Sequence, residues 1–88
     1  MIKLTGGNGS SKEQAIIILN AKTEREGVDA EYELVSKYFG IEDIDWRLVE
    51  QYLISSDATE RYYDILRIED RAGKQYEIYF DITDFIGK

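Results

Sequence analysis

The segment that most constrains the fold is residues 75–82, where apolar and polar side chains alternate. One side carries Tyr76, Ile78, Phe80 and Ile82, and the other carries Gln75, Glu77, Tyr79 and Asp81. Successive side chains of a β-strand point to opposite faces, so this alternation predicts a strand with one buried face. A sheet of this kind needs a second layer, and we expect an amphipathic helix to supply it.

The helix is expected over residues 24–39. Its apolar positions recur at spacings of three and four, at Val28, Tyr32, Val35 and Phe39. Thr23 and Glu26 have the spacing of a capping box at the start, and Gly40 stands where a helix commonly ends. The solvent-facing side of this helix is expected to carry Glu31, Glu33 and Lys37.

The other expected elements are a helical turn over residues 11–14 and strands over 15–20, 46–54 and 62–69. In the strand at 46–54, one face is expected to hold Trp46, Leu48, Tyr52 and Ile54. The sequence therefore predicts an α+β fold of the order β-α-β-β-β, with one helix packed on a mainly antiparallel sheet. Its last three strands form a meander. Residues 1–10 are expected to be a flexible glycine-rich segment, and residues 11–88 a single domain.

The strand at 62–69 is apolar on both faces, and one helix covers only one of them. Either the N-terminal segment folds over the second face, or that face is a contact surface. Soluble monomers seldom expose large apolar patches, so the excess favours a second copy of the chain or another protein as partner. The candidate interaction surface consists of Val49, Leu53, Tyr63 and Ile65.

Composition excludes several kinds of chemistry. The chain has no cysteine, which excludes disulfides, a thiolate nucleophile and thiolate zinc sites. It also has no histidine, the side chain that most often acts as a general acid or base near neutral pH. We therefore expect no enzyme activity, no metal and no cofactor. A net charge of −7 opposes nucleic acid and anionic membranes and favours a basic protein partner. The first residues lack the apolar core of a signal peptide, so a cytoplasmic location is expected.

The glycine-rich run that starts at Gly6 is the candidate ligand site. Successive backbone amides can form an anion-binding nest, here from Gly7, Asn8, Gly9, Ser10 and Ser11. A phosphate loop of the Walker type has lysine before serine or threonine, whereas Lys12 follows two serines. The competing interpretation is a flexible turn whose serines cap the segment that follows.

Four segments follow one another along the chain: residues 6–11, 15–17, 26–32 and 79–88. In this combination the chain resembles a group of short uncharacterised bacterial proteins that carry an N-terminal GG(D/N)GSS segment and a C-terminal YFDI…F.GK segment. The resemblance implies a free-standing bacterial domain. It implies no activity and no functional residues.

Three functional hypotheses follow from these observations. The first is a protein-interaction or self-association module without catalysis. The second is small-ligand or anion binding at the glycine-rich loop. The third is an acidic inhibitor or immunity-type protein that neutralises a basic partner.

Overall fold

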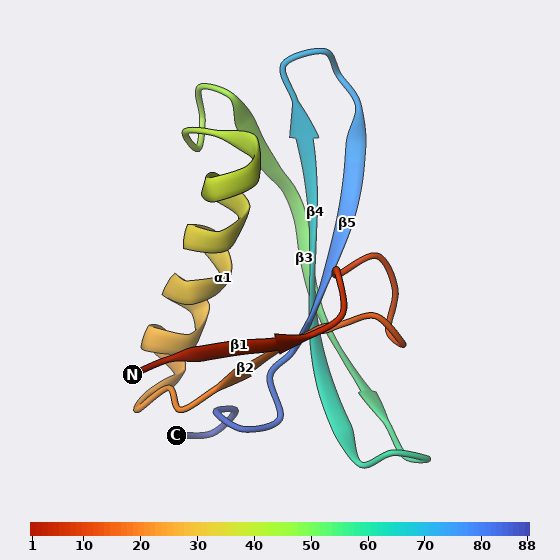
Figure 1. Ribbon diagram of the computed structural model, residues 1–88. Coiled ribbons are helices and arrows are strands. Elements are labelled where there is room, and N and C mark those ends of the chain that lie inside the picture. Colours follow the sequence, from red (N-terminus) through yellow and green to blue (C-terminus); the bar gives the residue numbers. More distant parts are fainter.

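The computed structural model describes residues 1–88, which form one helix and a five-stranded sheet. In chain order the elements are β1 (Lys3–Gly6), β2 (Ile16–Leu19), α1 (Glu24–Phe39), β3 (Trp46–Ser56), β4 (Arg61–Asp70) and β5 (Gln75–Asp81). The strands lie in the order β1-β2-β5-β4-β3. Figure 1 shows α1 packed along one side of the sheet and the β4–β5 turn at the top of the sheet.

The predicted α+β class and the meander are confirmed, because β3, β4 and β5 pair antiparallel in sequence order. The sheet is nevertheless mixed, since β2 runs parallel to β5 after the crossover through α1. The predicted order lacks β1, which pairs antiparallel with β2 and makes the order β-β-α-β-β-β. Lys3–Gly6 therefore belongs to the sheet, although a flexible segment was expected there. All four of its residues are exposed at an edge, so no hydrophobic alternation marks this strand in the sequence.

The helix begins and ends where the sequence predicts. The Thr23 hydroxyl accepts a hydrogen bond from the Glu26 amide at 3.1 Å, which satisfies one of the free amides of the first turn. Gly40 ends the helix with a φ of 102°, a value that glycine adopts without a Cβ clash. The polar face is wrong in one position: Glu31 faces the sheet and is fully buried.

The core lies between α1 and the sheet. Phe80 and Ile82 lie in it, and Tyr76 and Ile78 pack against it, so the predicted buried face of β5 is confirmed. Leu66 and Ile68 of β4 lie beside them, and the core also holds Trp46 and the almost fully buried rings of Phe80 and Phe85. Each fully buried side chain of this size stabilises the fold by roughly 1.5–3 kcal/mol.

A β-bulge divides β3 into two parts with opposite orientation. The register to β4 shifts between Leu48 and Glu50, so Val49 is an extra residue in the ladder. Before the bulge, Trp46 and Leu48 lie on the helix side of the sheet. After it, Tyr52 and Ile54 pair with Ile65 and Tyr63 on the opposite side. The prediction that Trp46, Leu48, Tyr52 and Ile54 share one face is therefore wrong, because one inserted residue reverses a period of two.

The sheet face away from α1 is covered largely by its own long side chains. Tyr52 on β3 reaches across β4 and donates to the Glu77 Oε2 atom on β5 at 2.6 Å. Arg67 on β4 donates to the same carboxylate at 3.0 Å. Ile65 lies between Tyr52 and Tyr79 in the ladder and is only 1% exposed. Most of the predicted apolar excess on this face is thus buried within a single chain.

Candidate functional site

The glycine-rich loop is a closed hairpin connection between β1 and β2. Gly7 donates its amide to the Ala15 carbonyl at 3.1 Å, and Gly9 donates to the Gln14 carbonyl at 2.6 Å. A Cβ on Gly7 would lie 2.5 Å from the Gln14 backbone, so only glycine permits this close approach. The loop needs glycine for its own hairpin geometry.

The amides predicted to bind an anion are largely engaged inside this loop. Besides Gly7 and Gly9, Ser10 donates its amide to the Asn8 Oδ1 atom at 3.0 Å. The Ser11 hydroxyl accepts from the Gln14 amide at 3.2 Å, which is the capping contact that the sequence predicts, in a turn rather than a helix. An anion at residues 7–11 would have to compete with these bonds.

The loop also marks the point where the pairing of β5 with β2 ends, while the pairing of β5 with β4 continues on the other side. β2 pairs with β5 only at Phe80 and Asp81, and the Gly9 carbonyl accepts from the Tyr79 amide at 2.8 Å. In an antiparallel ladder, alternate residues direct their backbone groups to the same side. Gln75 and Glu77 therefore turn their amides and carbonyls to the same side as Tyr79, where no strand lies beside them. The N-terminal half of β5 is an open edge.

An apolar groove of about 740 Å³ runs beside this edge, between β5, the C-terminal half of α1 and the glycine-rich loop. Its apolar lining comes from α1, β5, β1 and β2: Leu4, Ile16, Leu34, Val35, Tyr38, Phe39, Tyr76 and Ile78. The rings of Phe39 and Tyr76 pack with their centroids 4.9 Å apart and link the helix to the strand at one end. We call this feature the β5 groove.

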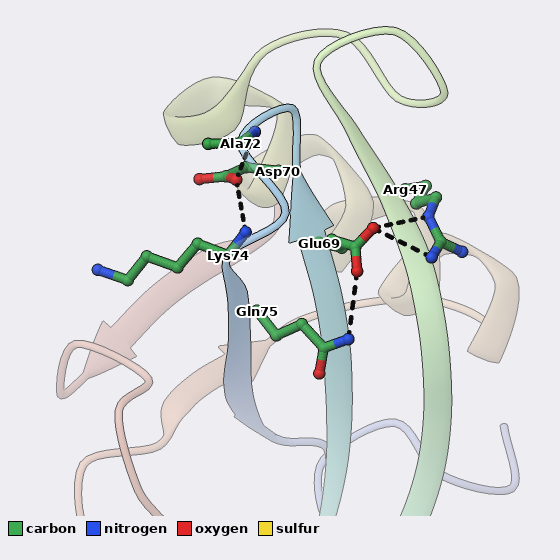
Figure 2. Close-up of polar contacts among 6 residues, drawn as sticks. All are labelled: Arg47, Glu69, Asp70, Ala72, Lys74 and Gln75. Carbon is green, nitrogen blue, oxygen red and sulfur yellow. Dashed lines mark hydrogen bonds and ion pairs between the residues drawn. The ribbon is translucent and has the colours of Figure 1, made fainter.

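The β4–β5 turn holds Tyr76 in place at that end of the β5 groove. Figure 2 shows the Asp70 carboxylate inside the turn, where Oδ1 accepts from the amides of Ala72 and Lys74, each at 3.0 Å. The other oxygen accepts from the Tyr76 hydroxyl at 3.2 Å. The Lys74 amide, followed by the Tyr76 hydroxyl, lowers the pKa of Asp70 against the effect of desolvation. Beside the turn, Glu69 bonds both Arg47 and Gln75 (Figure 2).

The unpaired charges at the β5 groove are positive. Lys37 lines it, and the Lys74 ammonium lies 5.1 Å from the centre of the Tyr76 ring; neither lysine makes an ion pair. The one carboxylate in the lining, Glu77, is bound by Tyr52 and Arg67 on the other face, and these hydrogen bonds lower its pKa. The groove thus differs in sign from the chain as a whole.

A second hollow, of about 720 Å³, lies on the sheet face away from α1, between the glycine-rich loop and the β3–β4 turn. Its central charges satisfy each other: Arg61 Nε lies 2.6 Å from Asp81 Oδ2. Burial opposes ionisation of Asp81, but hydrogen bonds from Arg61 and Thr83 outweigh it and lower the pKa. Polar and charged residues such as Lys12, Glu13 and Thr59 also line this hollow, and it presents no open strand edge.

The four residues predicted as an interaction surface are separated by the fold. Tyr63 and Ile65 are buried on the sheet face away from α1. Val49 and Leu53 are exposed on β3, and Leu53 pairs with Asp64 on the helix side. Only the latter two are available for contact.

Glu31, which was expected on the solvent-facing side of the helix, is buried beside the Asp64 carboxyl. Neither carboxylate oxygen of Glu31 has a hydrogen-bond partner. Burial, followed by the neighbouring Asp64 carboxyl, raises the pKa of Glu31 to about 10. Asp64 accepts from the Gln51 side chain at 2.9 Å, and Gln51 in turn accepts from the Tyr32 hydroxyl at 3.2 Å. Glu31 lies four residues from both Gly27 and Val35, and this spacing was the available signal for its burial.

Glu31 has no exposed surface and lines neither the β5 groove nor the second hollow. No group of three acidic side chains converges on a possible metal position. The single helix falls short of the length and apolarity needed to cross a membrane. The β5 groove is therefore the best-formed candidate site in this α+β domain.

Comparison with protein families, with curated proteins and with solved structures gave no match.

Proposed function

We propose that the protein is an interaction module that binds an extended peptide segment of another protein in the β5 groove. The peptide adds to the open edge of β5 as a further strand. Main-chain hydrogen bonds to Gln75 and Glu77 supply affinity, and side chains at alternate positions enter the groove against Leu34 and Ile78. This mode of strand addition beside a helix is a recurrent way in which domains recognise peptides.

The observation that carries this proposal is the coincidence of an open strand edge with an apolar groove. Unpaired edges promote uncontrolled association, and natural proteins usually cover or charge them. Here the edge of β5 on the N-terminal side of Tyr79 is left open, beside the eight apolar residues that line the groove. A bound strand would satisfy the edge and cover the groove at the same time.

The charges of the β5 groove define the chemistry of the peptide further. Lys37 and Lys74 are unpaired, so the favoured ligand carries a carboxylate near the end that lies beside Tyr76. A peptide with lysines at that end would meet like charges and bind more weakly. The basic partner expected from the net charge would have to use another surface.

The proposal is tested by NMR titration with synthetic octapeptides that alternate valine and threonine and end in either two glutamates or two lysines. We expect shifts in the amides of Gln75 and Glu77, with tighter binding of the acidic peptide. Shifts confined to other regions, or no response to either peptide at about millimolar concentration, would contradict the proposal.

A matched pair of variants separates edge pairing from contact with the groove alone. Gln75→Pro removes a backbone amide that makes no hydrogen bond within the sheet. Gln75 is the first residue of β5, a position at which a strand tolerates proline. Gln75→Ala changes the same side chain but keeps the amide. We expect Gln75→Pro to bind about tenfold more weakly than Gln75→Ala; equal affinities would exclude strand addition. In addition, Lys37→Gln should reduce the preference for the acidic peptide.

A further inference from the structure

The opposite edge of the sheet, formed by β3, is also open, and its free backbone groups can be assigned. The Asp70 amide bonds the Lys74 carbonyl at 2.9 Å, so even-numbered residues of β4 direct their backbone groups toward β5. Odd-numbered residues of β4 therefore bond β3. By the register beyond the bulge, Gln51, Leu53 and Ser55 turn their amides and carbonyls to the free edge.

The side chains along this edge are symmetric in polarity. Residues 50–56 read polar, polar, apolar, apolar, apolar, polar, polar: Glu50, Gln51, Tyr52, Leu53, Ile54, Ser55 and Ser56. Leu53 is the centre of this pattern and is 55% exposed. A second copy of the same strand, placed antiparallel about Leu53, would match apolar to apolar and polar to polar at every position.

We propose that two copies of the chain associate through β3, antiparallel, with a two-fold axis at Leu53. Leu53 then lies opposite Leu53 of the second copy, Tyr52 opposite Ile54, and Gln51 opposite Ser55. The free backbone groups of residues 51, 53 and 55 bond their counterparts, and the two sheets become continuous. This surface is separate from the β5 groove, which lies at the other side of the meander.

Other symmetric registers fit less well. A two-fold axis at Glu50 places two carboxylates directly opposite each other, which is destabilising. A two-fold axis at Gln51 places the polar Glu50 opposite the apolar Tyr52. An axis at Tyr52 places the polar Gln51 opposite the apolar Leu53. Segment 50–56 also contains no lysine or proline, the residues that commonly block edge pairing. The bulge at Val49 precedes this segment and leaves its pairing regular.

Net charge sets the conditions under which the dimer forms. Each copy carries −7, so approach is opposed by long-range repulsion that salt screens. We expect association to strengthen as sodium chloride rises from about 0.02 M to about 0.5 M, where the Debye length falls well below 10 Å. An interface dominated by ion pairs would weaken over the same range.

Sedimentation equilibrium on the full chain tests the proposal. Leu53→Lys places two lysines opposite each other on the axis and should weaken association at least tenfold. The matched control is Ile44→Lys, which replaces another exposed apolar residue, 64% exposed and outside β3, and should associate as the wild type does. A wild type that stays monomeric at about millimolar concentration in high salt, or equal effects of the two variants, would overturn the proposal.

Spin labels test the register independently of affinity. The chain has no cysteine, so single cysteines at residues 51, 53 and 55 can be labelled without background. Distances between the two copies should be shortest at residue 53 and longer, by similar amounts, at 51 and 55, because each residue away from the axis adds roughly 7 Å between the copies. A minimum at another residue would exclude this register.

Discussion

At the scale of the residue, Glu31 is the most unusual side chain of this protein. A buried carboxylate without a partner costs more than folding normally tolerates, and the favoured species is therefore the neutral acid. The Asp64 carboxyl lies beside it, and the Gln51 amide and the Tyr32 hydroxyl complete the polar cluster. The cluster joins the middle of α1 to β3 and β4, so the protonation of Glu31 affects how the helix is held.

The pKa of Glu31 makes stability depend on pH in a defined direction. The folded-state pKa of about 10 lies above the ordinary value of 4.5, so the folded chain holds a proton that the unfolded chain releases. The contribution is complete below the ordinary pKa and is lost as pH rises toward the folded value. Glu31→Gln should remove this loss and raise the free energy of unfolding at about pH 9 by about 1–3 kcal/mol.

Urea unfolding of wild type and variant at several pH values measures this effect. Glu33→Gln is the matched control, because Glu33 is an exposed glutamate two residues away on the same helix. We expect the control to follow the wild-type pH dependence. If Glu31→Gln follows it as well, Glu31 is not protonated in the folded protein.

At the scale of the element, the contact of α1 with the C-terminal segment depends on Gly27. Glycine in a helix interior normally costs about 1 kcal/mol relative to alanine. A Cβ at Gly27, however, would lie 2.5 Å from the Phe85 ring, which is almost fully buried. The glycine thus allows the C-terminal turn to pack directly on the helix.

Gly27→Ala should therefore destabilise the protein, against the helix propensity, by about 1–3 kcal/mol. Thermal unfolding measures the change. The double variant Gly27→Ala with Phe85→Leu provides the control, since the smaller side chain removes the ring that the new methyl group meets. The double variant should lose less stability than the two single changes added together; strict additivity would show that Gly27 and Phe85 are not coupled.

At the scale of the whole molecule, acidic groups act in two opposite ways. Glu77 and Asp70 have lowered pKa values because hydrogen bonds from Tyr52 and Arg67, and from the Lys74 amide, favour their charged forms. Such groups stabilise the fold above their ordinary pKa values and lose this effect as pH falls. Glu31 acts in the reverse sense. The net charge of −7 adds a general repulsion at neutral pH that salt screens.

The stability of the wild type should consequently pass through a maximum on the acid side of neutrality, at about pH 5 to 6, and decrease on both sides. Unfolding experiments from about pH 2 to about pH 9, below the concentration at which two copies associate, would establish the curve. Salt should raise stability at neutral pH. A maximum above pH 8 would contradict the assignment of Glu31 as a buried neutral acid.

Several features of this fold follow from the local sequence. The helix over residues 24–39, its Thr23 cap and the buried side of β5 all depend on periodicity or on contacts between near neighbours. These signals are independent of how the chain is arranged in space. The exclusion of thiol and imidazole chemistry likewise depends only on composition.

The remaining features depend on contacts between distant segments. β1 exists because β2 offers it an edge, and one extra residue at Val49 reverses the orientation of everything after it in β3. The burial of Glu31 and the lining of the β5 groove depend on where α1 crosses the sheet. Pairing register and helix placement are set by the packing of residues far apart in the chain. For this reason the open edges of β3 and β5 became visible only in the tertiary structure, whereas both strands were predicted from the sequence.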